Sequence, residues 1–309
     1  MIDIIITSYG EINATEKAIR AILDQNLKED FRIIVSDPFS ETKWMIEEKF
    51  PNDSRILFVE DEDKGKSNAL NILFSNFDSK EANDIFILTD GDVFVDDNAI
   101  PEILKKFEDQ NVGCVSGRAA SINPRTDKFG YWSHFLVDVG AHQISRKKRY
   151  EKGQFLETTG YLFAFRKGVI REIPLDVAED TIIPYYFFKK GYKIAYAENA
   201  IVNVKWPTNM QDWIKQKKRA ADAHTKLTRY APDFPKVKSF AGEITGGITN
   251  IPLILSYPKN FKEVIWTLEL FPTRLYMWLS LIKDAKIKKS EYKDGWREDL
   301  AVESTRTLD

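Results

Sequence analysis

The sequence predicts an α/β fold with a Rossmann-like, mostly parallel central sheet covered by helices on both faces. Two observations carry this prediction. Short β-rich segments alternate with helical segments from the N-terminus to residue 90, an order typical of parallel sheets. These strands are also continuously apolar, as expected when both faces of a sheet are buried. The segment from residue 236 to 309 has a different composition and is expected to form a mainly helical tail.

The first predicted strand is the apolar run "IDIIITS" at the N-terminus. A helix from Ala14 to Leu27 is expected to follow, because its apolar residues recur at helical spacing. Asn13 with Glu16 three residues later resembles a capping box, in which two side chains bond the free amides at the start of a helix. The pattern therefore predicts that Asn13 caps this helix.

The next elements continue the alternation of strand and helix. We expect strands in the apolar runs and helices where apolar residues recur every three or four positions. In order, these are the strand "FRIIVSD" (31–37), a helix over 42–50, the strand "RILFVE" (55–60), a helix over 66–74 and the strand "DIFILTD" (84–90).

The pattern changes from about residue 112 onward. The apolar run "VGCVSGRAA" is followed by a polar and aromatic stretch that includes "SRKKRY", and then by "TTGYLFAFRKGVI". No internal repeat or low-complexity linker is present. We expect one domain over residues 1–235, divided into halves 1–110 and 111–235, and a helical extension over 236–309.

Composition excludes several classes of protein. The chain carries 45 Lys and Arg against 47 Asp and Glu, so no global basic field favours nucleic acid as a partner. The single cysteine, Cys114, rules out an internal disulfide and a multi-cysteine zinc site, and it favours a reducing compartment. The N-terminus lacks the features of a signal peptide, and no clean run of about 18 apolar residues is present. We therefore expect a cytoplasmic protein.

Polar residues follow every predicted strand of the first half. Because ligands bind outside the carboxyl ends of parallel strands, these residues are expected to gather at one edge of the sheet. They are Thr7, Ser8 and Tyr9 after the first strand, Asp37 after the second, "EDEDKGKSN" after the third, and Asp90 with Asp92 after the fourth. Carboxylates grouped with a Lys/Gly loop favour a site for an anionic ligand and a metal.

Asp90 and Asp92 are separated by one glycine at the end of an apolar strand. Two carboxylates so close raise each other's energy of ionisation unless a cation lies between them. A divalent metal is the simplest such cation. The alternative is that the pair only caps a helix or solvates a turn, since Asp-x-Asp alone is a common pattern.

Four features in order along the chain resemble the family 2 glycosyltransferases, and especially the subgroup of cellulose and hyaluronan synthases. They are Asp37 in "IIVSD", "DGD" at 90–92, "AED" at 178–180 and "QKKRA" at 216–220. "KGKSNALN" and "WPTNMQDWIKQKKR" also look like this subgroup. The resemblance covers roughly residues 1–225. It implies a GT-A fold and an inverting enzyme that uses a nucleotide-sugar donor, with UDP-sugars as the default and GDP-mannose next.

The resemblance implies a donor site in the half 1–110. Asp37 would accept a hydrogen bond from the nucleobase, in a pocket shared with Thr7, Ser8 and Tyr9. Lys66 would reach the nucleotide phosphates as a point charge. A turn aspartate before Pro38 and a solvated helix-start lysine are the plain structural alternatives for Asp37 and Lys66.

The diphosphate would be bound through the acidic pair and one helix. Asp90 would lie near the ribose, and Asp92 would ligate Mn²⁺ or Mg²⁺ between the two phosphates, because a diphosphate and oxygen ligands suit these metals. Gln216 and Arg219, three residues apart on one helical face, would contact the diphosphate or the acceptor chain.

The resemblance places the acceptor in the half 111–235. Asp180 would be the general base that takes the proton of the acceptor hydroxyl, with Glu179 beside it and Gly160 allowing close approach of a ligand. The alternative is that "AEDT" only starts a helix, where acids are favoured by the helix dipole. The family pattern ends in tryptophan where this chain has Ala220, which speaks against a stacking platform for a growing polysaccharide.

Two other functions remain open from the sequence. A haloacid-dehalogenase-type phosphatase also carries Asp-x-Asp after an apolar strand and needs Mg²⁺, but that family usually places the motif on its first strand, and here three strands precede it. A GT-A domain could also bind a nucleotide sugar or a partner without turnover. The three histidines, His134, His142 and His224, lack metal-ligand spacing and are expected to be structural or exposed.

The tail segment 251–289 has the composition of a helix at an anionic membrane surface. Aromatic and basic residues carry this expectation: Trp266, Tyr276, Trp278, Lys283, Lys286, Lys288 and Lys289. Pro272 is expected to break the helix, and its polar residues fall in two stripes, so the amphipathic pattern is weak. We expect peripheral contact with the cytoplasmic face of a membrane and a glycan or lipid-linked acceptor; the alternative is a pair of helices packed on the domain.

Overall fold

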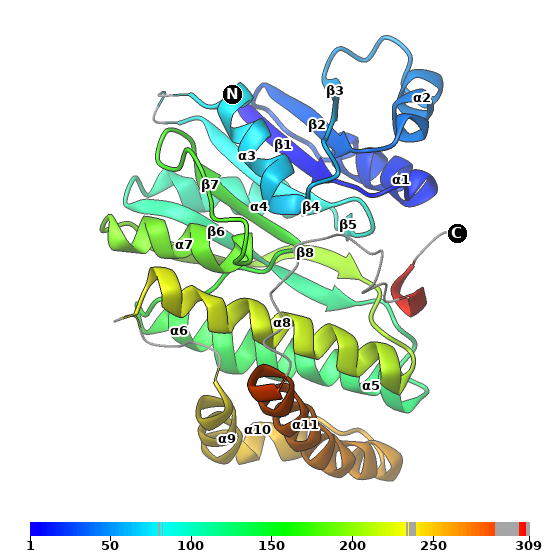
Figure 1. Cartoon of the computed structure of the whole chain (residues 1–309), viewed down its shortest axis with the longest axis vertical. Helices are drawn as coiled ribbons and strands as arrows, with labels where there is room; N and C mark the ends of the chain where they lie inside the picture. Colours follow the sequence, from blue (N-terminus) through cyan, green and yellow to red (C-terminus); the bar gives the residue numbers. More distant parts are fainter. Residues whose placement is uncertain (80, 82, 233, 235–238, 288–302, 307–309) are drawn as a thin grey trace.

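The computed structural model describes residues 1–309 except 80, 82, 233, 235–238, 288–302 and 307–309. Across these residues, one eight-stranded sheet has the order β3-β2-β1-β4-β7-β6-β8-β5 (Figure 1). Its strands are β1 (Ile2–Thr7), β2 (Phe31–Asp37), β3 (Ile56–Glu60), β4 (Ile85–Asp90), β5 (Phe94–Val95), β6 (Val112–Ser121), β7 (Leu162–Arg166) and β8 (Lys193–Val204).

Helices connect the strands and cover the sheet. The first half contains α1 (Ile12–Leu23), α2 (Ser40–Lys49), α3 (Lys66–Phe77), α4 (Ala99–Leu104) and the 3₁₀ helix η1 (Lys105–Glu108). The second half contains α5 (Lys128–Phe135), the π-helix η2 (Leu136–Lys147), α6 (Lys148–Glu151), α7 (Glu179–Lys189) and α8 (Met210–Tyr230). The tail contains α9 (Phe240–Thr249), α10 (Ile251–Ser256), α11 (Phe261–Ile287) and the 3₁₀ helix η3 (Glu303–Thr305).

The first four strands are parallel and in register, as predicted. Thr7, the last residue of β1, is paired with Ser36 on one side and Asp90 on the other. Asp37, at the end of β2, is paired with Glu60 at the end of β3. The expectation that the polar residues after these strands gather at one edge of the sheet is therefore confirmed.

The second half of the sheet is mixed. β7 lies antiparallel between β4 and β6, whereas β6 and β8 are parallel and β5 is antiparallel to β8. Because β7 runs against β4, its first residue, Leu162, is paired with Thr89 near the end of β4. The loop that precedes β7 is thus brought to the edge of the sheet that carries Asp90.

Both faces of the sheet are buried, which explains the continuous apolar strands. In β1, the side chains of Ile4 and Ile6 belong to the core on the α1 side. Ile5, which points to the other face, packs with Leu70 and Phe74 of α3. The apolar residues of β1 therefore pack against helices on both faces of the sheet.

The predicted capping box at Asn13 is wrong. α1 begins at Ile12, and its N-cap is Glu11, whose side chain makes no capping hydrogen bond. The chain turns early because Gly10 has a φ of 69° and donates its amide to Asp37 at 2.9 Å. A positive φ is readily adopted by glycine, so the turn is completed before Asn13 is reached.

The tail packs on the domain, which confirms the alternative of helices docked on the catalytic unit. α11 contacts α5 and α8, and the lower part of Figure 1 shows the three tail helices beneath α5 and α8. The Arg125 guanidinium bonds both carboxylate oxygens of Glu263, at 2.9 and 2.7 Å. Nε1 of Trp132 donates to the backbone oxygen of Trp266 at 2.7 Å.

The predicted break at Pro272 is also wrong, since α11 runs through it from Phe261 to Ile287. The hydroxyl of Thr273 donates to the backbone oxygen of Glu269 at 2.8 Å within the same turn. Among the described helices, none is long and apolar enough to cross a membrane. Lys288 and Lys289 lie outside the described residues, and so do the side chains of Lys286 and His224.

Candidate active site

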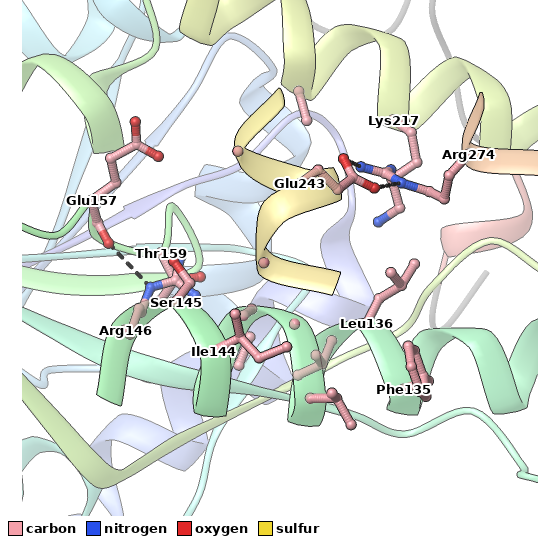
Figure 2. Close-up of a pocket in the computed structure, with 18 of the residues that line it drawn as sticks. Phe135, Leu136, Ile144, Ser145, Arg146, Glu157, Thr159, Lys217, Glu243 and Arg274 are labelled. Carbon is pink, nitrogen blue, oxygen red and sulfur yellow. Dashed lines mark hydrogen bonds and ion pairs between the residues drawn. The ribbon is translucent and has the colours of Figure 1, made fainter. Parts of the chain in front are cut away.

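A cavity of about 1420 Å³ opens at the edge of the sheet where β4 ends and extends to the tail helices. Figure 2 shows part of its wall. Residues from five separate motifs of the sequence line it together: Lys66, Asp90, Asp92, Gly160, Glu179, Asp180, Gln216 and Arg219. The structure thus brings most of the predicted site into one space.

Lys66 lies at the start of α3 between two carboxylates. Its Nζ is 2.6 Å from an oxygen of Asp90 and 2.6 Å from an oxygen of Glu179. The Thr7 hydroxyl donates to the same oxygen of Asp90 at 3.0 Å. Burial opposes the charge of Lys66, but the two carboxylates outweigh burial and hold the pKa of its ammonium above the ordinary value.

This network gives Lys66 and Glu179 partners that the sequence did not indicate. The ammonium expected to reach the phosphates is only 10% exposed and joins β4 to the first turn of α7. Glu179, expected on the acceptor side, is one of its two partners. The network therefore fixes Asp90 and α7 relative to each other.

We expect Lys66→Met to lower the free energy of unfolding by about 3–5 kcal/mol, because it leaves two buried carboxylates without their cation. Urea unfolding at neutral pH measures this change. Lys64→Gln is the control, since Lys64 forms an exposed pair with Glu62 two residues earlier and no change in the midpoint is expected. Equal unfolding midpoints for the Lys66 variant and the parent would show that the pair is not formed in solution.

Asp92 has the chemistry of a cation ligand. Burial, followed by the nearby charge of Asp90, raises the pKa of its carboxyl to about 7. A bound cation would offset both effects, so the residues present fit a divalent metal. No group of three or more His, Cys, Asp or Glu side chains suited to a metal occurs among the described residues. Asp92 would therefore share the metal with oxygens of a ligand.

Gly91 separates the two aspartates because no side chain fits there. A Cβ at this position would lie 2.8 Å from the Thr15 hydroxyl and 3.0 Å from Cβ of Ser8. The Gly91 amide donates to the backbone oxygen of Thr7 at 2.8 Å. β1 thus holds the Asp-Gly-Asp turn in place, and this contact requires glycine.

Asp180 lies in the first turn of α7 and faces the same cavity. Its backbone oxygen accepts hydrogen bonds from the Thr158 amide at 3.2 Å and the Thr158 hydroxyl at 2.8 Å. A Cβ at Gly160 would lie 3.4 Å from Oδ2 of Asp180, so this carboxylate rests against the glycine. The loop before β7 therefore contacts Asp180. The close approach of a ligand expected at Gly160 stays a prediction.

α8 contributes Gln216 and Arg219 from one face, as their spacing predicted. Oε1 of Gln216 is buried without a hydrogen-bond partner, and a ligand with a donor group would satisfy it. The positive charge of Arg219 acts on Asp92 and favours its ionised form. Both side chains thus lie in the cavity that also holds the acidic pair.

The sequence did not single out Tyr161 and Trp206, which also line the cavity. Their ring centroids are 5.6 Å apart in an edge-to-face arrangement. Burial raises the pKa of the Tyr161 hydroxyl, and the charges of Asp92, Asp90 and Asp180 add to this effect. Tyr161 thus lies where the three carboxylates converge; its position directly after Gly160 in "TTGYLF" was the signal that could have found it.

Trp213 of α8 is a core residue and does not line the cavity. It is 2% exposed, and its ring centroid lies 5.5 Å from that of Trp132. Trp206 takes the place at the cavity wall, and the Nζ of Lys217 lies 4.7 Å from its ring centroid. Ala220, at the position where the family pattern has tryptophan, also lines the cavity.

Thr7, Ser8 and Tyr9 line a second, smaller pocket next to the main one, and Lys66 borders both. Asp61 and Asp63 from the loop after β3 complete this pocket. The Ser8 hydroxyl is 2.7 Å from that of Thr15, so Ser8 also holds the start of α1. The nucleobase pocket expected here stays a prediction.

Asp37 is fully buried and lines neither pocket. Its carboxylate accepts hydrogen bonds from the amides of Gly10 and Phe39 and from the Thr42 hydroxyl, each at 2.9 Å. These bonds fix the turns after β1 and β2, which agrees with the structural alternative for this residue. Its expected bond to a nucleobase stays a prediction.

A family model described as glycosyl transferase family 2 matches residues 3–174, more than half of the chain. Hyaluronan synthase from Streptococcus pyogenes is 24% identical over 168 residues, which cover 50% of this chain and 39% of that protein. NDP-glycosyltransferase ltbB from Aspergillus luteorubrus is 26% identical over 132 residues, 36% of this chain and 32% of that protein. The chain thus matches about two fifths or less of the length of these relatives.

Solved structures support the fold. The mannosyltransferase PcManGT from Pyrobaculum calidifontis, in complex with GDP-Man and Mn²⁺, has a TM-score of 0.60 at 15% identity, covering 94% of this chain and 88% of that chain. TarS from S. aureus has a TM-score of 0.50 at 11% identity, covering 74% and 39%. The α/β fold of the GT-A type expected from the sequence is confirmed, with its helical C-terminal region.

Proposed function

Since the chain belongs to glycosyl transferase family 2, we propose that it moves a sugar from a nucleotide-diphosphate donor to a hydroxyl of an acceptor, with inversion at the anomeric carbon. One observation carries this proposal. Asp90, Asp92 and Asp180, which come from two distant motifs, lie in one cavity, and the charges of all three act on Tyr161. A donor and an acceptor can therefore meet in one space.

The donor side of the proposed site is the acidic pair with α8. Asp92 would hold a divalent cation, Mn²⁺ or Mg²⁺, which when bound stabilises the negative charge of the departing nucleoside diphosphate. Asp90, which Lys66 and Thr7 fix, would accept hydrogen bonds from the ribose. Gln216 and Arg219 would contact the diphosphate. Lys66 acts here as a positioning residue.

The acceptor side is built around Asp180. The acceptor oxygen forms a bond to the anomeric carbon, the bond from that carbon to the diphosphate breaks with its electron pair, and the acceptor proton passes to the Asp180 carboxylate. The Thr158 bonds hold the backbone of residue 180, and the carboxylate lies against Gly160 in the cavity. Such positioning would favour the in-line geometry that the displacement needs.

The donor class rests on the resemblance and on one structural neighbour. UDP-sugars are the default for this family, and PcManGT was solved with GDP-Man. We propose a UDP-sugar first and GDP-mannose second. The placement of the acidic motif on the fourth strand of a family 2 glycosyltransferase domain leaves no support for the phosphatase alternative.

Thermal unfolding with a panel of nucleotide sugars tests the proposal. In the presence of Mn²⁺, we expect one donor to raise the melting temperature, because a ligand at about 100 times its Kd stabilises the folded state by about 2.7 kcal/mol. Without metal, the shift should be much smaller. If no nucleotide sugar stabilises the protein while it hydrolyses simple phosphate esters, the assignment is wrong.

We propose that α11 lies on an anionic membrane surface. One face of this helix is buried against the domain, through Glu263, Thr267, Leu270 and Met277. The other face is exposed and apolar over most of its length, through Phe261, Val264, Ile265, Leu268, Phe271, Leu275, Tyr276 and Leu279. Exposed Lys259, Lys262 and Lys283 flank this face and complement anionic lipid.

Apolar residues on both faces also explain why the amphipathic pattern of this segment was weak. Two of the aromatic residues expected at the membrane pack inward instead. The Trp266 ring centroid lies 5.9 Å from that of Tyr131, and that of Trp278 lies 6.0 Å from that of Phe240. Of Trp266, Tyr276 and Trp278, only Tyr276 is exposed.

Co-sedimentation with phosphatidylglycerol liposomes tests this surface. We expect replacement of Leu268 and Leu279 by glutamate to weaken binding at least about tenfold, since each leucine loses burial in the bilayer. Leu175→Glu, which changes an exposed leucine in the loop before α7, should bind like the parent. Recovery of parent and double variant in equal amounts in the supernatant would refute membrane contact.

A further inference from the structure

The main cavity is larger than the donor requires. Sites for small ligands typically occupy about 300–1,000 Å³, whereas this cavity measures about 1420 Å³. The acidic residues and α8 account for one end of it. The remainder lies between the π-helix η2 and the tail helices α9 and α11, and no residue of the proposed transfer chemistry lies on those three helices.

The walls of this second part are mostly apolar, apart from the ion pair between Glu243 of α9 and Arg274 of α11. Side chains from η2, α9 and α11 face the same space: Leu136, Val139, Ile144, Ile248, Leu270 and Phe271. Figure 2 shows Leu136 and Ile144 rising from η2 toward α9. A Cβ at Gly246 of α9 would lie 3.7 Å from Ile144, and one at Gly247 would meet nothing within 4 Å. The glycines leave the space between the two helices open.

Cations line the cavity where η2 passes into α6. Arg146, Lys148, Arg149 and Lys152 follow the apolar residues of η2 along the same wall. Within the described chain, the contacts of the first three are to neutral oxygens. Arg146 bonds the backbone oxygens of Glu157 and Thr158, Lys148 bonds the amide oxygen of Asn250, and Arg149 bonds the backbone oxygen of Phe155.

These cations adjoin the catalytic end of the cavity. Arg146 donates to the Thr158 backbone oxygen at 3.0 Å, and the Thr158 hydroxyl donates to the Asp180 backbone oxygen at 2.8 Å. The cations thus lie next to the loop that contacts Asp180, and the apolar residues of η2 precede them along the same wall. The apolar wall continues to exposed residues of the tail such as Ile248 and Phe271.

We propose that the acceptor is an anionic amphiphile, a phosphorylated lipid. Its hydrocarbon chain would lie between η2, α9 and α11, its phosphate beside Arg149 and Lys152, and its hydroxyl-bearing end at Asp180. This assignment of the acceptor rests on the proposed sugar transfer. A free glycan would leave the apolar walls unused, and a neutral lipid would leave the cations without an anion.

Binding of dodecyl phosphate tests the proposal without donor, metal or turnover. The fluorescence of Trp206 and Trp278, which line the cavity, reports occupancy below the micelle concentration. We expect saturable binding of dodecyl phosphate, weaker binding of dodecyl glucoside and none of inorganic phosphate over the same range. Replacing Arg149 and Lys152 by glutamine should weaken dodecyl phosphate about tenfold or more. Replacing the exposed Lys43 and Lys49 of α2 should leave it unchanged.

The apolar wall is tested by Gly246→Leu, which fills the gap toward Ile144 and replaces a glycine within a helix. We expect this variant to bind dodecyl phosphate more weakly than the parent and to melt at the same temperature as the parent. Absence of saturable binding, equal binding of inorganic phosphate, or unchanged binding in both cavity variants would overturn the proposal. Dodecyl phosphate binding by a protein that no nucleotide sugar stabilises would instead refute the sugar-transfer function and leave the amphiphile site in place.

Discussion

Asp180→Asn is expected to bind the donor as tightly as the parent and to transfer sugar about 10²- to 10⁴-fold more slowly, the range that general bases contribute. The amide has nearly the shape of the carboxylate but cannot take the acceptor proton. The backbone bonds from Thr158 to residue 180 do not involve the side chain and are retained. The loss should therefore fall on kcat, measured as nucleoside diphosphate release with saturating acceptor.

A matched control separates the base from its surroundings. Glu172→Gln changes an exposed carboxylate in the loop that leads to α7 and should leave the rate unchanged. Donor binding, measured by calorimetry, should be equal in the parent, the Asp180 variant and the control. A parental transfer rate in Asp180→Asn would exclude Asp180 as the base.

Asp92→Asn is expected to abolish the metal-dependent part of donor binding, a loss of at least about a hundredfold. Removal of residues that only support metal ligands costs 10- to 100-fold in metal affinity, and loss of the ligand itself should exceed this. Calorimetric titration of nucleoside diphosphate with and without Mn²⁺ measures the change. Asp97→Asn, an exposed aspartate five residues later, serves as the control.

The same substitution should not unfold the protein. The pKa of Asp92 is raised to about 7, so its ionised form lowers the stability of the metal-free protein as pH rises through this value. Asparagine carries no charge and removes this penalty. At pH 8 without metal, Asp92→Asn should therefore melt at or above the temperature of the parent. A lower melting temperature would mean that the contacts of the Asp92 carboxylate outweigh this penalty in the metal-free protein.

The sequence was sufficient to predict the parallel half of the sheet. "IDIIITS", "FRIIVSD", "RILFVE" and "DIFILTD" are apolar on both faces, and only a sheet covered on both sides accommodates them. Once those strands are parallel, Thr7 and Asp90 must lie side by side at one edge. This part of the site follows from local pattern and topology together.

Contacts between distant segments could not be predicted in the same way. Lys66 has two partners: Asp90, which lies 24 residues away at the end of β4, and Glu179 at the start of α7. No local pattern predicts the pairing with Glu179. Tyr161 reaches the site because β7 runs antiparallel beside β4, which the apolar run alone does not indicate. Gln216 and Asp180 could be named only through the resemblance to a known family.

The tail shows a different limit of sequence analysis. Proline was expected to break the helix, but packing of α11 on α5 and α8 outweighs the missing hydrogen bond at Pro272. The sequence of α11 does not show one apolar stripe because the helix has two apolar faces, one packed against the domain and one exposed. The cavity beneath these helices depends on three-dimensional packing and on the glycines of α9, which composition does not reveal.

The most direct test of the account is the anomalous diffraction of Mn²⁺ in crystals grown with the metal and a nucleoside diphosphate. The account predicts one strong peak within about 2 Å of a carboxylate oxygen of Asp92, with diphosphate oxygens completing its coordination and Asp180 facing the same cavity. A diphosphate bound without metal at Asp92, or a Mn²⁺ peak away from this carboxylate, would contradict it.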